Sequence, residues 1–190
     1  MSAKARAVLA ALTQRGALLE GHFRLSSGRH SDRFIQKFRI LEDPALLEPL
    51  ARAIADAFAA VKPTVVISAA VGGIVLGYEV ARHLRTKAIF VEKENGVAVL
   101  RRNFTLGPDD RALIVEDVVT TGLSVREVID VVRSCGAQVA GVGVIVMRGE
   151  ADFGVPTRAL LDLPMVSYDS AECPQCASGM PIDDPGSRRS

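Results

Sequence analysis

The chain has 190 residues, of which 48% are hydrophobic, and its formal net charge is +1 at pH 7. This length and composition suit one α/β domain with a sizeable core, and the near-neutral charge argues against a dedicated nucleic-acid surface. No run of about 18 apolar residues occurs, and the apolar run 7–12 is too short for a signal peptide, so we expect a cytoplasmic protein without a membrane segment.

The first 40 residues predict a helix followed by a small antiparallel element. Apolar residues alternate with charged ones at helical spacing over residues 2–15, and Gly16 stops this helix. Two strand-like pieces, 17–25 and 31–36, then flank a turn rich in Ser and Gly. The turn carries more polar and basic groups than a simple hairpin needs.

The middle of the chain predicts two units of a parallel sheet. Asp43 and Pro44 open a helix that runs to about residue 60, and a buried strand follows at 65–67. The small-residue turn 68–73 then leads into a helix over 74–84. Such a turn can bind an anion through its backbone N–H groups, or it can be only a tight connection.

Residues 92–104 predict a mobile hairpin after a short strand at 87–91. The pair Asn95-Gly96 favours a type I′ turn between extended arms. Roughly twenty residues separate two core strands here, which is long for a connector inside a compact domain. We interpret the hairpin as a lid.

The most specific chemical pattern lies at residues 112–124. Four apolar residues lead into Glu116 and Asp117, and two valines later the chain enters the turn Thr120–Ser124. Ser124 and Glu127 have the spacing of a capping box, and Gly136 ends the helix that follows. The segment therefore predicts a strand, a turn and a helix, with the turn at the carboxyl end of the strand.

This turn has the chemistry of a site for a phosphate monoester. Hydroxyls, backbone N–H groups and little steric bulk suit phosphate at a helix N-terminus, and the absence of lysine disfavours a nucleoside triphosphate loop. Glu116 and Asp117 fit beside a phosphate if the ligand brings hydroxyl donors or a divalent cation, as a ribose 5-phosphate with Mg²⁺ would. The alternative is a solvated acidic pair near a helix dipole.

The last third of the chain predicts two more strands and a tail. The apolar strand 139–147 ends at Arg148, and the strand 159–163 closes the sheet. The tail 172–190 is rich in Pro, Gly, Ser and charge, so we expect it to be poorly ordered or to lie along the surface. Its Cys173 and Cys176 form a CxxC pair, but zinc needs four ligands, no second CxxC is present, and the three histidines are distant in sequence. We therefore predict no zinc site.

Two segments resemble the type I phosphoribosyltransferases, which bind phosphoribosyl pyrophosphate. Residues 115–124 resemble the signature of that family. Residues 23–34 resemble the N-terminal hood of its orotate branch, through these positions: Phe23, Leu25, Ser27, Gly28, Ser31 and Phe34. The resemblance implies a doubly wound parallel α/β sheet in a single domain of residues 1–190, with a hood at about 1–40, a core at about 41–165 and a C-terminal extension at about 166–190.

The resemblance also implies an activity. The chain is expected to transfer the phosphoribosyl group of phosphoribosyl pyrophosphate to orotate, giving orotidine 5-phosphate and pyrophosphate in pyrimidine biosynthesis. It is expected to be a homodimer whose lid acts on the neighbouring subunit, with Mg²⁺ held mainly by substrate and water and by no direct protein ligand. The alternatives are a phosphoribosyltransferase for purines or other bases, and a non-catalytic sensor of phosphoribosyl pyrophosphate.

The residues to which the resemblance assigns roles fall into two sets. The expected catalytic set is Lys93, Glu116 and Asp117. The expected substrate-binding set is Ser27, Phe34, Ala70, Val71, Gly72, Gly73, Arg101, Arg102, Val118, Thr120, Thr121, Gly122, Leu123, Ser124 and Arg148. Arg148 at a strand end suits orotate because a guanidinium can pair bidentately with a carboxylate, although it could also be a solvated strand-end residue.

The chain departs from the family pattern at several basic positions. Many members carry a lysine where Ser26 stands, so a positive contact is expected from elsewhere, with Arg29 and Arg33 as candidates. Some orotate enzymes carry a lysine at the position of Gly72, and an aspartate usually precedes the arginine where this chain has Met147. The lid has no histidine.

Overall fold

The computed structural model describes residues 1–25 and 27–185. A six-stranded sheet has the order β5-β4-β3-β6-β7-β8, in which β4 and β5 are antiparallel and all other neighbours are parallel. Its strands are β3 (Val65–Ala69), β4 (Lys87–Glu94), β5 (Val97–Leu100), β6 (Arg111–Val119), β7 (Gln138–Met147) and β8 (Thr157–Asp162). This arrangement confirms the predicted parallel sheet.

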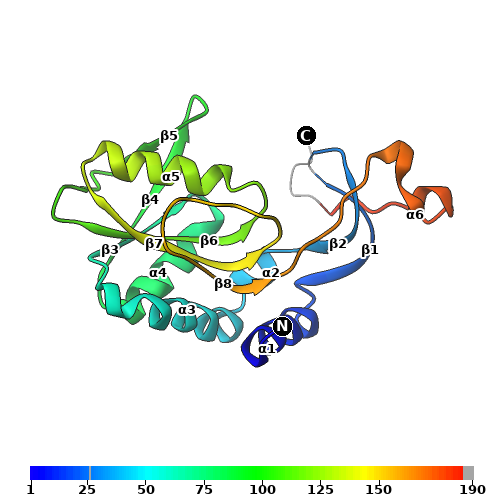
Figure 1. The fold of residues 1–190 in the computed structure, drawn as a ribbon, viewed down its shortest axis with the longest axis horizontal. Helices are drawn as coiled ribbons and strands as arrows, with labels where there is room; N and C mark the ends of the chain where they lie inside the picture. The colour runs from blue at the N-terminus through cyan, green and yellow to red at the C-terminus, as the bar shows by residue number, and fades with distance from the viewer. Residues whose placement is uncertain (26, 186–190) are drawn as a thin grey trace.

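Helices cover both faces of the sheet (Figure 1). On one face lie α3 (Pro44–Phe58), which a short 3₁₀ turn at Ala59–Val61 follows, and α4 (Gly72–Leu84); on the other lies α5 (Leu123–Ser134). Side chains of a strand alternate between the two faces, so Val66 packs with α3 and α4 while Ile67 packs with α5. Two apolar layers therefore hold a doubly wound domain together.

The first 41 residues and the end of the chain form a smaller unit beside the sheet. The helix α1 (Ala3–Gln14) leads to the antiparallel pair β1 (Leu18–Arg24) and β2 (His30–Ile35), and α2 (Phe38–Leu41) connects this pair to the core. The predicted hairpin is thus confirmed. The short helix α2 carries no sequence signal that we recognised.

The C-terminal segment (166–185) returns from β8 to the β1–β2 pair, as the orange and red ribbon of Figure 1 shows. Its two short helices are η2 (Ser170–Glu172) and α6 (Pro174–Ala177). Backbone hydrogen bonds join Tyr168 to His30 at 2.8 and 2.9 Å, and Asp183 to His22 at 2.7 Å and Arg24 at 2.9 Å. The segment is therefore ordered against the hood, and the expected alternative of a poorly ordered tail is wrong for these residues. Within 1–25 and 27–185, no helix is long and apolar enough to span a membrane.

Candidate active site

The strand β6 places two carboxylates at the carboxyl end of the sheet. Only 8% of Glu116 and 1% of Asp117 are exposed. Glu116 Oε1 accepts a hydrogen bond from the Asp117 N–H at 3.1 Å, and Asp117 Oδ1 accepts one from the Val118 N–H at 2.7 Å. The other oxygen of Asp117, Oδ2, is buried without a hydrogen-bond partner among the described residues. Such an atom is available to a ligand or a cation.

Burial, reinforced by the charge of Asp117, raises the pKa of Glu116 to about 8. At neutral pH Glu116 therefore mainly holds its proton, whereas it would be ionised in water. A protonated carboxyl can both donate and accept hydrogen bonds, which suits contact with a ribose hydroxyl.

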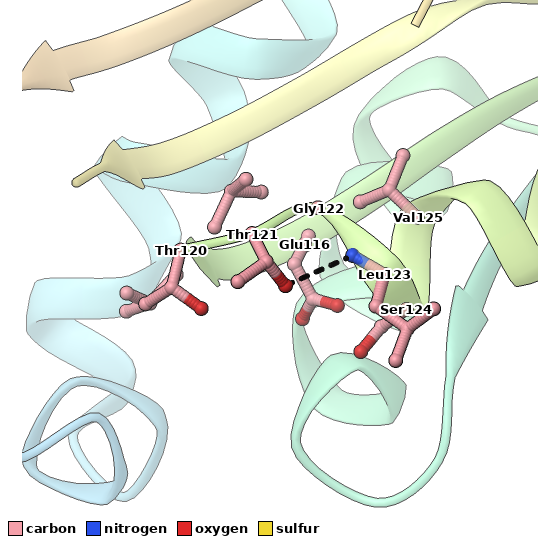
Figure 2. A pocket seen from close by; sticks show the side chains of 9 residues that line it. Glu116, Thr120, Thr121, Gly122, Leu123, Ser124 and Val125 are labelled. Carbon is pink, nitrogen blue, oxygen red and sulfur yellow. Dashed lines mark hydrogen bonds between the residues drawn. The ribbon is translucent and has the colours of Figure 1, made fainter. Parts of the chain in front are cut away.

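The turn after β6 forms a small pocket with Glu116 (Figure 2). Its lining residues are Glu116, Val118, Val119, Thr120, Thr121, Gly122, Leu123, Ser124 and Val125. Gly122 has φ +77° and precedes the first residue of α5, and no side chain caps this helix. The first N–H groups of α5 are therefore open to an anion, apart from a long 3.4 Å contact from the Leu123 N–H to Thr121 Oγ1.

The predicted capping box at Ser124 and Glu127 is wrong. The helix begins at Leu123, so Ser124 lies inside its first turn rather than at the N-cap. The left-handed conformation of Gly122 turns the chain into the helix earlier than the Ser/Glu spacing suggested. Glu127 instead pairs with Lys93 at 2.9 Å.

Arg126 supports the turn from behind, a role that the sequence did not reveal. Its Nη1 donates to the Thr121 carbonyl at 2.7 Å, its Nη2 donates to the Asp152 carbonyl at 3.3 Å, and its guanidinium lies 5.3 Å from the centre of the Phe153 ring. A Cβ on Gly122 would lie 2.7 Å from that ring. The only hint in the sequence was that Arg126 lies four residues after Gly122, one helical turn away, from where its side chain can reach back to the turn.

A larger cleft of about 990 Å³ joins the turn to the hood and the C-terminal segment. It brings together five of the predicted substrate-binding residues: Ser27, Phe34, Thr120, Thr121 and Arg148. Because the cleft shares Thr120 and Thr121 with the small pocket, one ligand could reach both.

Arg148 contributes a positive group to this cleft. Its Nε is buried and has no hydrogen-bond partner in the described chain. Burial lowers the pKa of Arg148, but a guanidinium stays charged at neutral pH. A charged donor buried without a partner is costly unless a ligand satisfies it, which favours an anionic group at this position.

Lys37 is a second residue near the site that sequence reasoning missed. It follows β2, lines the cleft, and places its Nζ 3.3 Å from Asp117 Oδ2, although the geometry of this ion pair is not that of a hydrogen bond. Its signal was a single lysine two residues after the second hood strand.

The two other basic candidates of the hood are engaged elsewhere. Arg29 lines the cleft, but its guanidinium binds Ser167 at 2.7 and 2.9 Å and Asp169 at 2.9 Å. Arg33 Nε lies 3.7 Å from Glu20. Ser26 lies outside the described residues. Lys37 is therefore the hood cation that meets the carboxylate pair.

The turn between β3 and α4 brings Ala70, Val71, Gly72 and Gly73 to the same end of the sheet. A Cβ on Gly72 would lie 2.6 Å from Asp117 Oδ2 and 2.8 Å from Lys37 Nζ. A Cβ on Gly73 would lie 2.8 Å from Ser68 Cβ. Gly72 is thus needed for the approach of this turn to the acidic pair, and Gly73 for the packing of α4 on β3.

The three predicted lid cations lie away from both cavities in this conformation. Lys93, Arg101 and Arg102 do not line either cavity in the described structure, and they pair instead with three acidic residues of the same chain. The pairs are Lys93 with Glu127 at 2.9 Å, Arg101 with Glu94 at 2.8 Å and Arg102 with Glu92 at 2.8 Å. All three cations are more than half exposed, so these pairs are weak and can exchange.

Comparison with known proteins agrees with this geometry. Residues 39–153 match the family described as phosphoribosyl transferase domain. An orotate phosphoribosyltransferase of Pelotomaculum thermopropionicum is 50% identical over 184 residues, which cover 96% of this chain and 97% of the relative. One of Chlorobium phaeobacteroides is 52% identical over 175 residues, which cover 91% of each chain.

Solved structures show the same fold. The crystal structure of orotate phosphoribosyltransferase from Aeropyrum pernix is similar with a TM-score of 0.69 and 29% identity, over 81% of this chain and 92% of that one. Adenine phosphoribosyltransferase from Rhodothermus marinus shares the fold with a TM-score of 0.65 at 22% identity, over 83% of this chain and 99% of that one. From the family match and the extent of these identities, the chain belongs to the orotate phosphoribosyltransferase branch of the phosphoribosyltransferase family.

Proposed function

We propose that this chain transfers the phosphoribosyl group of phosphoribosyl pyrophosphate to orotate, releasing pyrophosphate and forming orotidine 5-phosphate. The observation that carries this proposal is the pair of adjoining cavities that share the phosphate turn: Glu116 of the buried acidic pair lines the small pocket, and Arg148, whose Nε has no partner in the described chain, lines the cleft. The 5-phosphate binds the open N-terminus of α5, and the ribose hydroxyls meet Glu116 and Asp117. The carboxylate of orotate then pairs with Arg148 across the cleft.

The reaction is a displacement at the anomeric carbon, in which positive charge develops on the ribose. Nitrogen N1 of orotate bonds to the anomeric carbon as the bond to pyrophosphate breaks, and the proton of N1 leaves to the departing pyrophosphate or to water, so the protein mainly positions the reactants. Asp117 lies 1% exposed beside the ribose site, where its charge stabilises the developing positive charge more strongly than it would in water. Lys37, 3.3 Å from Asp117, offers a positive charge to the phosphate groups.

The residues present fit Mg²⁺ as a cofactor. Asp117 Oδ2, which has no hydrogen-bond partner in the described chain and lies 3.3 Å from Lys37 Nζ, is an oxygen donor of the type that this ion prefers, although substrate and water would supply most of its ligands. When bound, Mg²⁺ would neutralise charge on the departing pyrophosphate.

A homodimer is part of the proposal. The turn before α4 and the first two turns of that helix expose three apolar side chains, with Val71 74%, Val75 49% and Tyr78 67% exposed. A partner subunit at this face would cover them and would bring the lid of one chain toward the cleft of the other. Lys93, Arg101 and Arg102 would then exchange their weak intrachain ion pairs for the pyrophosphate.

Product analysis tests this function. The purified chain is incubated with phosphoribosyl pyrophosphate, Mg²⁺ and equal amounts of orotate, uracil and adenine, and the nucleotides are separated by chromatography. Orotidine 5-phosphate should be the main product. Preferential formation of adenosine 5-phosphate would contradict the assignment of the base, and no nucleotide with any base would contradict catalysis.

A pair of variants ties the activity to the site. Asp117→Asn should lower turnover on the order of 10²-fold or more, since it removes the charge that faces the ribose. Asp130→Asn, an exposed position on α5, serves as the control and should retain normal turnover. Near-normal turnover of a folded Asp117→Asn protein would exclude this carboxylate from catalysis.

A further inference from the structure

Four side chains that can bind a metal meet between the β1–β2 pair and the C-terminal segment, and none of them lines the cleft. His22 lies on β1, His30 on β2, and Cys173 and Cys176 lie at the start of α6 and within it. One nitrogen or sulfur atom of each residue lies within 4.8 Å of those of the other three. The separation in sequence that argued against zinc therefore does not persist in the fold, because the C-terminal segment returns to the β1–β2 pair. We propose that His22, His30, Cys173 and Cys176 bind one structural zinc ion.

The spacing of the ligand atoms fits a tetrahedral ion. Zinc lies about 2.0 to 2.1 Å from nitrogen and about 2.3 Å from sulfur, so a regular tetrahedron separates two nitrogens by about 3.3 Å and a nitrogen from a sulfur by about 3.6 Å. Here His22 Nε2 is 3.1 Å from His30 Nδ1. Cys173 Sγ is 3.5 Å from His22 Nε2, and Cys176 Sγ is 3.7 Å from His22 Nε2 and 3.3 Å from His30 Nδ1. Four of the six separations are thus close to those of a tetrahedral zinc site, and all six are within 4.8 Å.

A second contact prepares His22 as a ligand. Its Nδ1 lies 2.9 Å from the Met180 carbonyl oxygen, which can only accept a hydrogen bond, so Nδ1 carries the proton. Nε2 then presents its lone pair to the cluster. This arrangement, in which the outer nitrogen of a ligating histidine donates to a carbonyl, fixes the tautomer and the ring orientation at metal sites.

Burial and ligand number indicate a structural site. His22, His30 and Cys173 are 3%, 6% and 2% exposed, whereas Cys176 lies at the surface. Four protein ligands leave no open position for a substrate. A cluster of two irons would place thiolates on one iron and imidazoles on the other, but here each imidazole nitrogen has a sulfur neighbour within 3.5 Å. A set of two sulfurs and two nitrogens around one point favours zinc.

The ion would fasten the C-terminal segment to the hood. The direct contacts between them include the hydrogen bond from Gln175 Nε2 to the Gly21 carbonyl at 2.8 Å, and those of Arg29 with Ser167. Ser167, Asp184 and Pro185 also line the cleft. Because His30 and Cys173 are far apart in sequence, one ion that joins them closes a long loop and stabilises the folded hood.

Metal analysis of the full chain tests the proposal without any activity measurement. The chain, expressed in medium containing zinc and purified without chelator, should carry about one zinc ion per chain by mass spectrometry of the elements. After reduction and chelation, Co²⁺ added to the metal-free chain should produce the d–d absorption of a tetrahedral site and thiolate-to-cobalt charge transfer, and Zn²⁺ should abolish both. Chelation should also lower the melting temperature.

Two cysteine variants give the matched comparison. Cys176→Ser changes the exposed ligand and should lower zinc affinity by more than the roughly 10- to 100-fold that follows loss of an outer hydrogen-bond partner. Cys135→Ser, at the end of α5, should bind zinc normally. If Cys176→Ser does not fold, the Co²⁺ titration of the unsubstituted chain decides.

Three results would overturn the proposal. The first is a reduced chain that contains no zinc and shows no thiolate-to-cobalt charge transfer with Co²⁺. The second is a Cys173–Cys176 disulfide whose reduction leaves metal uptake absent. The third is equal loss of zinc in Cys135→Ser and Cys176→Ser.

Discussion

Glu116→Gln tests the protonation of the buried pair on β6. The amide keeps the size of the side chain and an oxygen that can accept from the Asp117 N–H, but it cannot ionise. Because the pKa of Glu116 rises from 4.5 to about 8 on folding, the folded chain holds a proton between these values that the unfolded chain has released. The stability of the unsubstituted chain should therefore fall as pH rises through this window.

The size of the effect follows from the shift. Each pH unit within the window contributes at most about 1.4 kcal/mol, so the carboxyl contributes a loss on the order of a few kcal/mol by pH 8. The Glu116→Gln variant lacks this loss. Its free energy of unfolding should therefore increase relative to that of the unsubstituted chain between pH 5 and pH 8, and the difference should not change with pH below about 4.5.

Urea unfolding followed by circular dichroism at half-unit steps of pH measures this difference. Phosphate buffers are avoided, since phosphate could bind the turn and stabilise the folded state. Glu150→Gln, at an exposed position, is the control and should follow the unsubstituted chain. A difference between Glu116→Gln and the unsubstituted chain that stays constant from pH 5 to pH 8 would refute the argument that Glu116 is protonated in the folded state.

Three further predictions concern catalysis. Gly72→Ala should lower turnover about 10²-fold while the sheet stays folded, because the added Cβ would lie 2.6 Å from Asp117 Oδ2 and displace that carboxylate. Unchanged kinetics of this variant would contradict the close approach of the turn to Asp117. Arg148→Ala should raise the KM for orotate about tenfold to a hundredfold and leave the KM for phosphoribosyl pyrophosphate nearly unchanged. Arg148→Lys should restore little of the affinity for orotate. Equal increases in KM for both substrates would argue against a contact between Arg148 and the base. Mixed dimers of Lys93→Ala with Asp117→Asn, verified by mass, should regain activity through one complete site, and their inactivity would argue against a lid that acts between subunits.

Local pattern was enough to predict the core. The apolar runs and the helical spacing of apolar residues identified five of the six strands of the sheet and the three helices that cover it, with ends shifted by a few residues. The sixth strand, β5, was predicted only as an arm of the lid hairpin, whereas it pairs with β4 at the edge of the sheet. The Asn95-Gly96 turn was also predictable, because both residues have positive φ, as a type I′ turn requires. These features depend on contacts near in sequence or on one repeating period.

The start of α5 shows where local pattern fails. Ser124 and Glu127 have capping-box spacing, but one left-handed glycine earlier in the chain determines where the helix begins. That choice leaves the helix N-terminus uncapped, which a protein tolerates where a ligand replaces the cap. The misassigned cap therefore coincides with the proposed phosphate site.

Long-range contacts account for what sequence reasoning missed. The cluster of two histidines and two cysteines depends on the return of the chain to its first strand pair, and no spacing within either segment reveals it. The order of the C-terminal segment has the same origin, because its backbone groups find partners on β1 and β2 rather than within the segment. A composition rich in Pro, Gly and Ser indicates only that the segment would not fold by itself, and it does not reveal contacts with the rest of the chain.

Lys37 offers a physical explanation for the missing lysine at position 72, because it brings a positive charge to the same place. Its Nζ occupies the space beside Asp117 into which a side chain at position 72 would project, since a Cβ there would lie 2.8 Å away. A side chain at position 72 would therefore require Lys37 Nζ or the Asp117 carboxylate to move from its observed position. The glycine permits the charge to arrive from the hood instead of from the turn. Because the cation then belongs to the smaller unit of the fold, anything that holds the hood in place, including the C-terminal segment, also holds a positive charge next to Asp117.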